Sequence, residues 1–455
     1  MSTKKISLIL TLALLAALNP FPGAAVENNE LASSVLEPSK YVKGDKTAIE
    51  NLITSQLSNR LFSTGYGISI RDNTDGTILF ESNAQNSMLP ASLTKLYTAA
   101  STAITLDPDA RFVTKVKYLN NNVYLVGGAD PQLGTESNPT QADLADLAKE
   151  TAQKLKEFNV FEVNVFIDDA ILGPLQRPAD WEDTYFQSSE IHLISALNID
   201  DPSAPAKAPV DPSITTGQKF AFYLIKNNIK VNGLVSRKNT PKDAFELSTQ
   251  YSKSVSQLIE DTLMISNNQD AEILARVTSL VSENDPSTKA ATELVLKDVE
   301  LLGISSVDNA ITDASGLSRS NKISPSDLSE IIYKSIKNPV ITKVNKGETS
   351  KFMITPILPI TPDPWSVFTG LPTGHGLGTM KKRFDENNSA GRGVVRAKTG
   401  SLNRVITLAG TITTRDNVFL SFAILVNRVE EPENVREAID NLLNELAECN
   451  CAPTK

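Results

Sequence analysis

The sequence predicts an α+β fold in which an antiparallel sheet is covered by helices, with a helical subdomain and an inserted α/β block. Strand-like segments occur near both ends of the 455-residue chain, and a helical stretch from about residue 252 separates them. The block before that stretch alternates strand and helix on its own. Such a pattern is typical of one sheet closed by distant chain segments, with a second unit inserted between them.

The first part of the chain predicts a helix, a hairpin and a second helix. The helix covers residues 42–61, and GYGISIRD and GTILFES alternate like strands around the turn NTDG. SLTKLYTAASTAITL then predicts a helix with polar residues in its first turn, so its later turns should be buried.

The middle block begins after Asp107. RFVTKVKYL and VYLVGG predict another hairpin, TQADLADLAKETAQKLKEF an amphipathic helix, and VFEVNVFIDD a strand. Residues 200–213 are rich in Pro and Ala and predict a loop or linker, after which KFAFYLIKNNIKV predicts a helix. We assign residues 108–249 to this inserted block of one or two domains.

The last part of the chain predicts helices and then a strand pair. The helical segments are VSQLIEDTLM, QDAEILARVTSLV, TKAATELVLKDVELLGI, which Gly303 should end, and ISPSDLSEIIYKSI. RVITLAGTITT and VFLSFAILVN predict strands joined by RDN, and ENVREAIDNLLNELAE a closing helix. We assign residues 40–107 and 250–455 to one domain that carries the sheet.

Charge and histidine content exclude several classes of protein. The net charge is −9, and no basic run is present that would bind nucleic acid or anionic lipid. The two histidines, His192 and His375, cannot form a multi-histidine metal site, and a Ser-His-Asp enzyme would have to use one of them. We therefore expect no nucleic acid partner and no multi-histidine metal site.

The N-terminal residues have the pattern of an export signal. Lys4 and Lys5 precede the apolar segment ISLILTLALLAAL, and small residues follow it. The apolar segment is too short to span a bilayer comfortably, so we expect cleavage near Ala25 and a signal peptide over residues 1–25, with retention as an anchor as the alternative. The mature chain would have no stable membrane span and would be periplasmic or exported to the cell envelope.

The two cysteines, Cys449 and Cys451, lie in the C-terminal segment ECNCAPTK. One interpretation is a metal-binding or redox-active tail. We favour an incidental frayed tail, because a pair so closely spaced ties nothing to the core.

The first candidate motif is Ser92-x-x-Lys95, which follows Pro90 at the start of the Ala-rich helix. Residues three apart share a helix face, so the hydroxyl and the amine should project together. A lysine whose pKa is lowered by desolvation or nearby cations can act as the base for a serine nucleophile, and N–H groups at a helix N-terminus suit a developing oxyanion. The alternative is a serine at the helix start and a lysine that reaches solvent along its apolar stem.

The second candidate motif is Ser266-x-Asn268, between two predicted helices. We expect both side chains on one side of an extended turn, with Asn267 pointing elsewhere. The Ser266 hydroxyl could relay a proton to a leaving nitrogen, and the Asn268 amide could hold a substrate carbonyl. The alternative is a plain helix cap, since serine and asparagine are both favoured there.

The third candidate motif is Lys398-Thr399-Gly400, just before the first C-terminal strand. The lysine could offer fixed positive charge to a substrate carboxylate, and Gly400 permits close backbone approach. The N–H of Ser401 could complete an oxyanion hole with that of Ser92. The alternative is an ordinary turn before a hairpin strand.

In this order the three motifs resemble those of the penicillin-recognising serine transferases, which include penicillin-binding proteins and serine β-lactamases. The spacings, 174 residues from Ser92 to Ser266 and 130 from Asn268 to Lys398, are similar to those of the class C penicillin-binding proteins, the D-alanyl-D-alanine carboxypeptidase/endopeptidase (DacB) family. GGADPQL, DASGLSRSN, GHGLGTMKKR and KTGSLNRVITLAGTI extend the resemblance. It departs at Asn267, where the family usually has Asp, and in DASGLS, where DGSGLS is usual.

The resemblance implies a serine β-lactamase/transpeptidase-like fold and acyl transfer on peptidoglycan stem peptides, with β-lactams as inhibitors and no metal or organic cofactor required. Lys95 would take the proton of Ser92, Ser266 would relay a proton to the departing D-alanine, and Lys398 with Thr399 would recognise the terminal carboxylate.

The resemblance also implies that the inserted block approaches the cleft. Asp130 could then meet an amino group and Arg319 a carboxylate of a stem-peptide side chain such as diaminopimelate. The alternatives are a turn aspartate before Pro131 and a surface arginine.

Other functions remain open from the sequence. A class A β-lactamase usually carries an E-x-x-L-N motif, which this chain lacks, and needs a much shorter chain. A non-catalytic envelope-binding protein would not need all three motifs, and a histidine-based hydrolase would need a motif such as G-x-S-x-G. Nothing in the sequence separates carboxypeptidase from endopeptidase activity, and neither the third stem residue nor the oligomeric state follows from it.

Overall fold

The computed structural model describes residues 40–57, 65–136, 141–200, 209–305, 307–337, 353–354, 365–385 and 389–453. The expected signal peptide, residues 1–25, lies outside this part of the chain. The helices within these ranges include none that is long and apolar enough to cross a membrane.

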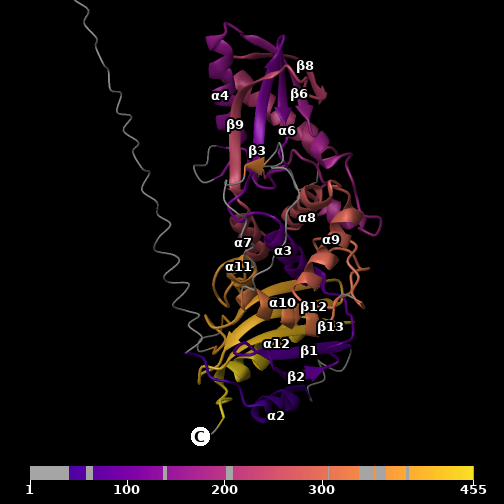
Figure 1. Ribbon diagram of the computed structural model, residues 1–455, viewed down its shortest axis with the longest axis vertical. Coiled ribbons are helices and arrows are strands. Elements are labelled where there is room, and N and C mark those ends of the chain that lie inside the picture. The colour runs from indigo at the N-terminus through magenta and orange to yellow at the C-terminus, as the bar shows by residue number, and fades with distance from the viewer. Residues whose placement is uncertain are drawn as a thin grey trace, which may run out of the picture. The chain divides into compact units, whose positions relative to one another are not determined.

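A five-stranded antiparallel sheet joins the two ends of the sequence. Its strands, in spatial order, are β11 (Arg396–Leu402), β12 (Val405–Thr413), β13 (Phe419–Asn427), β1 (Tyr66–Asp72) and β2 (Ile78–Ser82). Figure 1 shows the indigo strands β1 and β2 beside the yellow strands β12 and β13. The two predicted hairpins and the pairing of distant chain segments are confirmed.

Helices cover both faces of this sheet. Alternate residues of the strands, such as Phe422 and Ile424, pack in one core with α2 (Lys46–Leu57) and α12 (Pro432–Glu448). The other face contacts α10 (Pro325–Lys337), where the Ser69 and Ser329 hydroxyls are 2.9 Å apart. Because both faces are covered, β12 and β13 are buried along almost their whole length, and their sequences read as apolar runs.

A helical subdomain surrounds α3 (Thr94–Thr105), which follows the short 3₁₀ turn η3 (Ala91–Leu93). Every residue of α3 is buried, so the predicted burial of its later turns is confirmed and extends to its polar first turn. The remaining helices of this part are α7 (Val255–Ile265), α8 (Asn268–Glu283), α9 (Thr288–Leu301) and α11 (Trp365–Thr369). Helices α7, α8, α9 and α11 all contact α3, which makes α3 the central element.

The inserted block contains a second, mixed sheet with its own core. The strands are β3 (Arg111–Leu119), β4 (Asn122–Val126), β6 (Glu162–Asp168), β8 (Lys230–Arg237) and β9 (Phe245–Ser254). A short strand from outside residues 108–249, β10 (Met353–Ile354), also pairs with β3. Helices α4 (Leu144–Glu157) and α6 (Pro212–Lys226) pack on it through an apolar core. β4, β6 and β8 run parallel, while β9 and β4 flank β3 antiparallel.

Short elements complete the described chain. They are β5 (Leu133–Gly134), β7 (Ile199–Asp200), α5 (Asp183–Gln187), η4 (Ala170–Leu172) and η5 (Gly378–Met380).

Several elements differ from the sequence-based expectation. The end of the segment predicted as a helix, NNIKV, leads into strand β8, because α6 ends at Lys226. Strand β9 was not predicted, and its pairing with β3 carries the second sheet to Ser254, past residue 249. The Lys398-Thr399-Gly400 segment was expected just before the first C-terminal strand, but it lies within strand β11 and is paired with β12, so the alternative of an ordinary turn is wrong.

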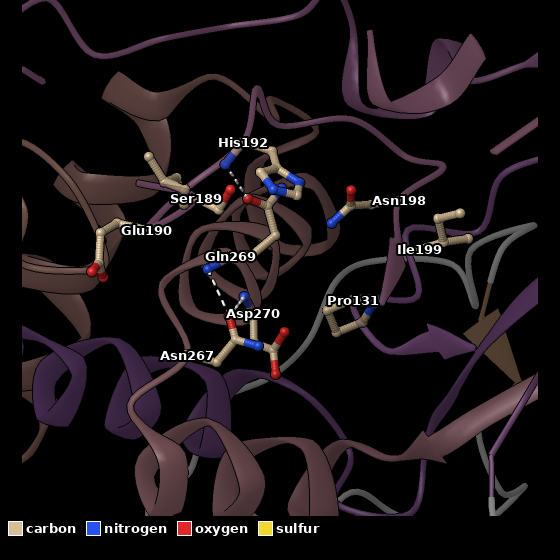
Figure 2. A pocket seen from close by; sticks show the side chains of 10 residues that line it. Pro131, Ser189, Glu190, His192, Asn198, Ile199, Asn267, Gln269 and Asp270 are labelled. Carbon is tan, nitrogen blue, oxygen red and sulfur yellow. Dashed lines mark hydrogen bonds between the residues drawn. The ribbon is translucent and has the colours of Figure 1, made fainter. Parts of the chain in front are cut away.

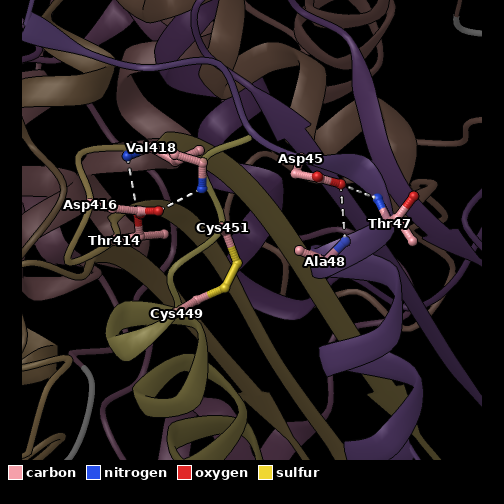
Figure 3. Close-up of a disulfide and its surroundings, with 9 residues drawn as sticks. Asp45, Thr47, Ala48, Thr414, Asp416, Val418, Cys449 and Cys451 are labelled. Atoms are coloured by element: carbon pink, nitrogen blue, oxygen red, sulfur yellow. Dashed lines mark hydrogen bonds between the residues drawn. A yellow bond between two sulfur atoms is a disulfide. The ribbon is translucent and has the colours of Figure 1, made fainter. Parts of the chain in front are cut away.

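The C-terminal segment packs against the residues around the start of α2 and the β12–β13 turn, and it does not fray. Cys449 and Cys451 form a disulfide, Cys451 is fully buried, and its carbonyl accepts a hydrogen bond of 2.6 Å from the Asp45 N–H. Figure 3 shows this pair beside Asp416, whose carboxylate accepts from the Ala452 N–H. The frayed-tail interpretation is therefore wrong, because these contacts come from the residue that precedes α2 and from the β12–β13 turn, both remote in sequence.

Candidate active site

The first motif brings a hydroxyl and a buried amine into contact. Ser92 lies in η3, and Lys95 lies in the first turn of α3. The Lys95 Nζ is 3.1 Å from the Ser92 Oγ, and the Lys95 side chain is fully buried whereas Ser92 is half-buried. The lysine therefore does not reach solvent, which argues against the surface-lysine alternative.

Three acceptors surround the Lys95 amine. Besides the Ser92 Oγ, Nζ donates to the Asn268 Oδ1 at 2.7 Å and to the Ser315 carbonyl at 2.6 Å. Burial lowers the pKa of Lys95 to about 8, and nearby carboxylates, Asp313 and Glu272 first among them, oppose that shift. An amine with this pKa exchanges its proton near physiological pH.

The second motif supplies a helix cap and, separately, a side chain that contacts Lys95. Ser266 ends α7 in a left-handed conformation, with φ of 61°, where an extended turn was expected. The Asn267 side chain caps α8 by accepting from the N–H groups of Gln269 and Asp270. Asn268 does not cap the helix, and its amide lies between the Lys95 amine and the Glu190 carbonyl. The helix-cap alternative thus describes Asn267 and not Asn268.

The third motif lies on edge strand β11, next to the turn that carries the nucleophile. Lys398 is fully buried, and its Nζ donates to the Thr399 carbonyl at 2.9 Å. Burial, and then repulsion by Lys95, hold the pKa of Lys398 well below its usual range. A Cβ on Gly400 would lie 2.9 Å from the Pro90 carbonyl oxygen, so the glycine permits β11 to approach Ser92 closely.

The segment from Asp313 to Gly316 completes the site, although the sequence analysis assigned it no role. The Asp313 carboxylate accepts from the N–H groups of Gly316 and Ser318 and from the Trp181 indole N–H. These bonds turn the segment toward η3, where Ser315 presents its carbonyl to Lys95. The only sequence signal for this segment was its place in DASGLSRSN, one of the stretches that carry the family resemblance. The group that acts here is a backbone carbonyl, which every residue has, so the residue type gave no signal of its own.

Gly316 permits this turn to pack directly on the residue before the nucleophile. Its φ is +88°, and a Cβ there would lie 2.0 Å from the carbonyl oxygen of Ala91, which itself has a φ of +50°. A left-handed non-glycine residue is strained, and such strain persists only where the surroundings hold it. The contact with Gly316 is one element of that support.

Gly316→Ala is expected to lower the free energy of unfolding by about 3 kcal/mol, through backbone strain and a clash that separates the two turns. β-Lactam acylation should fall together with stability. Gly393→Ala is the matched control, because Gly393 has a φ of +77° but open space around its Cβ position. Chemical denaturation of both variants checks this, and equal losses of stability would contradict the role of the clash.

The structure does not join Asp130 to the motif residues through any hydrogen bond among the described residues. Asp130 is buried, its Oδ1 accepts from the Gln132 N–H at 2.9 Å, and burial raises its pKa to about 7. The Gln132 side chain in turn donates to Asp270 on α8. Among the described residues, Asp130 is thus linked to α8 through Gln132 and forms no hydrogen bond with Ser266 or Asn268.

Arg319 lies by the turn between β11 and β12, which follows the third motif along the chain. Its guanidinium donates to the Asn403 carbonyl at 3.2 Å, and the side chain is exposed. Ser401, also exposed, directly follows the third motif on strand β11. The position of Arg319 beside this strand is compatible with contact to a ligand there.

A polar pocket of about 160 Å³ lies beside the second motif (Figure 2). It is lined by Pro131, Ser189, Glu190, Ile191, His192, Asn198, Ile199, Asn267, Gln269 and Asp270. The His192 backbone N–H donates to the Gln269 Oε1 at 3.0 Å, which ties the inserted block to α8. Across the described ranges of the chain, no group of three or more His, Cys, Asp or Glu side chains could hold a metal ion.

Comparisons with known proteins agree with this geometry. Residues 48–209 and 202–446 match the family described as the D-Ala-D-Ala carboxypeptidase 3 (S13) family. The chain is 27% identical over 387 residues to carboxypeptidase Rv3627c of Mycobacterium tuberculosis, covering 80% of this chain and 76% of that protein. It is 25% identical over 395 residues to carboxypeptidase DacB of Mycolicibacterium smegmatis, covering 84% of this chain and 80% of that protein.

Among solved structures, the chain resembles penicillin binding protein 4 (dacB) from Haemophilus influenzae, with a TM-score of 0.70 and 18% identity over 87% of this chain and 99% of that one. This similarity confirms the predicted α+β, transpeptidase-like fold. Together with the match over most of the sequence, it shows that the chain belongs to the D-Ala-D-Ala carboxypeptidase (S13) family of serine peptidases.

Proposed function

We propose that this protein is a serine D-Ala-D-Ala carboxypeptidase, DD-endopeptidase or both, which acts on peptidoglycan stem peptides through an acyl-enzyme on Ser92. The observation that carries the proposal is the fully buried Lys95 amine, 3.1 Å from the Ser92 hydroxyl and held by two further acceptors. Membership of the S13 family supports the same chemistry.

The hydrogen bonds around Lys95 suit a general base. A neutral amine has two N–H groups and one lone pair, whereas an ammonium has three N–H groups. If the two N–H groups bond to the Asn268 Oδ1 and the Ser315 carbonyl, the lone pair is left for the Ser92 hydroxyl. After proton transfer, the ammonium has one acceptor for each of its three N–H groups, so neither state leaves a donor unpaired.

The acylation step transfers the Ser92 proton to Lys95 while the Ser92 Oγ bonds to the carbonyl carbon of the penultimate D-alanine. The backbone N–H groups of Ser92 and Ser401 would hold the oxyanion. The C–N bond then breaks, and the leaving D-alanine nitrogen receives a proton relayed by the Ser266 hydroxyl, with help from Lys398. Water cleaves the ester and restores the Ser92 hydroxyl.

Recognition of the substrate would use charge at both ends. Lys398 and Thr399 would bind the terminal carboxylate, with Gly400 permitting close approach on β11. Asp130 and Arg319 would contact an amino group and a carboxylate at the far end of the stem peptide. Of the two, Arg319 has the better supporting position, beside the Ser401 end of β11.

We further propose that residues 1–25 direct export to the periplasm or cell envelope, where peptidoglycan lies. Residues 40–107 and 250–455 would form the catalytic domain and 108–249 the insert, with its last strand, β9, ending at Ser254. β-Lactams would acylate Ser92 and inhibit the enzyme, as the complex of the Haemophilus protein with a β-lactam suggests by analogy.

Digestion of purified muropeptides, followed by mass spectrometry, tests the proposal. We expect loss of one D-alanine from pentapeptides, cleavage of D-Ala cross-links, or both, and a single stoichiometric burst with nitrocefin. Fast nitrocefin turnover with unchanged muropeptides would instead identify a β-lactamase, and no product with no burst would identify a binding protein.

A further inference from the structure

Glu272 holds the peptide that faces Lys95 from the side opposite Ser92. It lies on α8 four residues after Asn268, so both side chains project from one face of the helix. Glu272 is 1% exposed, and its Oε1 accepts from the N–H groups of Ala314 and Ser315, each at 2.8 Å. Buried backbone N–H groups need acceptors, and one carboxylate oxygen supplies both.

The same short segment is held from α3. The Thr98 hydroxyl donates to the Ala314 carbonyl at 2.7 Å, and Thr98 lies three residues after Lys95 on that helix. The next carbonyl, that of Ser315, accepts from the Lys95 Nζ at 2.6 Å. Glu272 and Thr98 therefore fix the acceptor of the lysine from two different helices.

Glu272 also contributes charge to the site. Burial first, and then Asp313, raise the pKa of Glu272 to about 7, while Arg276, four residues later on α8, opposes the rise. The charged groups that act on Lys95 from the elements packed around it are Asp313, Glu272, Glu190 and Asp270, and Lys95 in turn lowers the pKa of Lys398. Glu272 and Asp313 both bond to this segment: Glu272 accepts from the Ser315 N–H, and Asp313 accepts from the Gly316 N–H of the peptide whose carbonyl faces Lys95. Of the two, Glu272 comes from α8, so it ties this segment to the helix that also carries Asn268.

We infer that Glu272 is a positioning residue for acyl transfer: it orients the Ser315 carbonyl toward the Lys95 amine and supplies the negative charge that favours the ammonium form. The inference rests on the proposed function, in which Lys95 is the base for Ser92. Glu272 does not touch the substrate or the Ser92 hydroxyl in this arrangement, so it acts through Lys95.

The test compares Glu272→Gln with Glu272→Asp by the pH dependence of acylation with a fluorescent penicillin. The Gln carbonyl can still accept both N–H groups, but the charge is gone, so Lys95 should lose its proton more easily. We expect the acid limb of the rate profile to move to lower pH by about one unit, with the plateau rate kept within a few-fold. Glu272→Asp keeps the charge but shortens the reach, so the limb should stay in place while the plateau falls about 10-fold to 100-fold.

Asp298→Asn is the matched control. Asp298 is also a fully buried carboxylate that packs on α3, but it accepts from the Ser101 and Thr105 hydroxyls, further along the helix from Lys95. Its substitution should leave the limb where it is in the wild type. An equal shift in this variant would overturn the inference, because any lost buried carboxylate would then suffice.

The inference also fails if the Glu272→Gln profile superimposes on that of the wild type, or if Glu272→Asp keeps the wild-type plateau. The Asp variant keeps the test decisive should the Gln variant not fold. In each of these outcomes, penicillin would still acylate Ser92 of the wild type. Failure of the proposed function would instead appear as no acylation of the wild type at all.

Discussion

Replacement of Ser92 by alanine is expected to abolish covalent labelling by fluorescent penicillin and to lower the turnover of muropeptides by about 10⁴-fold to 10⁶-fold. The physical reason is that the proposed acyl-enzyme has the Ser92 Oγ as its bonding atom, which alanine lacks. The Lys95 amine would keep the Asn268 and Ser315 acceptors, so the fold should persist. Intact-mass spectrometry after incubation with penicillin measures the adduct directly.

Ser101→Ala is the matched control for this substitution. Ser101 is also buried on α3, where its hydroxyl donates to Asp298 at 2.7 Å. Its loss should cost about 1 kcal/mol of stability and leave acylation close to the wild-type rate. Labelling that persists in Ser92→Ala would show that the nucleophile is a different residue.

Replacement of Lys95 by methionine is expected to slow acylation by about 10²-fold to 10⁴-fold, the usual contribution of a general base. In the wild type, the rate should rise with pH around pH 8, since the pKa of Lys95 is about 8 and only the unprotonated amine can take the proton of Ser92. The variant should lose this rise. Stopped-flow acylation between pH 6 and about pH 10 measures both effects.

Lys95→Arg separates the base from the charge. A guanidinium keeps the positive charge but does not give up a proton at these pH values, so the variant should be as slow as the methionine one. A fast Lys95→Arg enzyme would mean that the site needs only a cation, and the mechanism would have to assign the base elsewhere. Circular dichroism of both variants checks that the buried site still folds.

Much of the fold could be predicted from the sequence, because local pattern encodes helices and hairpins. The alternation in β1 and β2, the Ala-rich helix α3 and the amphipathic helix α12 all depend on neighbours close in the chain. Strand β9 was missed for the same reason. Its polar, weakly alternating segment FELSTQYSKS becomes a strand through its pairing with β3, more than a hundred residues earlier.

The candidate site divides in the same way. The three motifs could be recognised as short patterns, and the second one already placed Asn268 beside Ser266 with Asn267 pointing elsewhere, but it did not show that Asn267 would cap α8 or that Asn268 would reach the Lys95 amine. Asn267 and Asn268 are chemically identical, and only the start of α8 distinguishes them. The role of Glu272 had no sequence signal, because its partners are backbone N–H groups, which every residue carries.

By itself the sequence determined the kinds of chemistry that the chain can perform: a serine, two lysines and an asparagine in short motifs, together with the helices and hairpins that bear them. The tertiary structure alone decided the state of the lysine. Its acceptors Asn268 and Ser315 lie 173 and 220 residues further along the chain. The pKa of an amine depends on how much water and charge surround it in space, so only packing of these distant segments can lower it to a useful value.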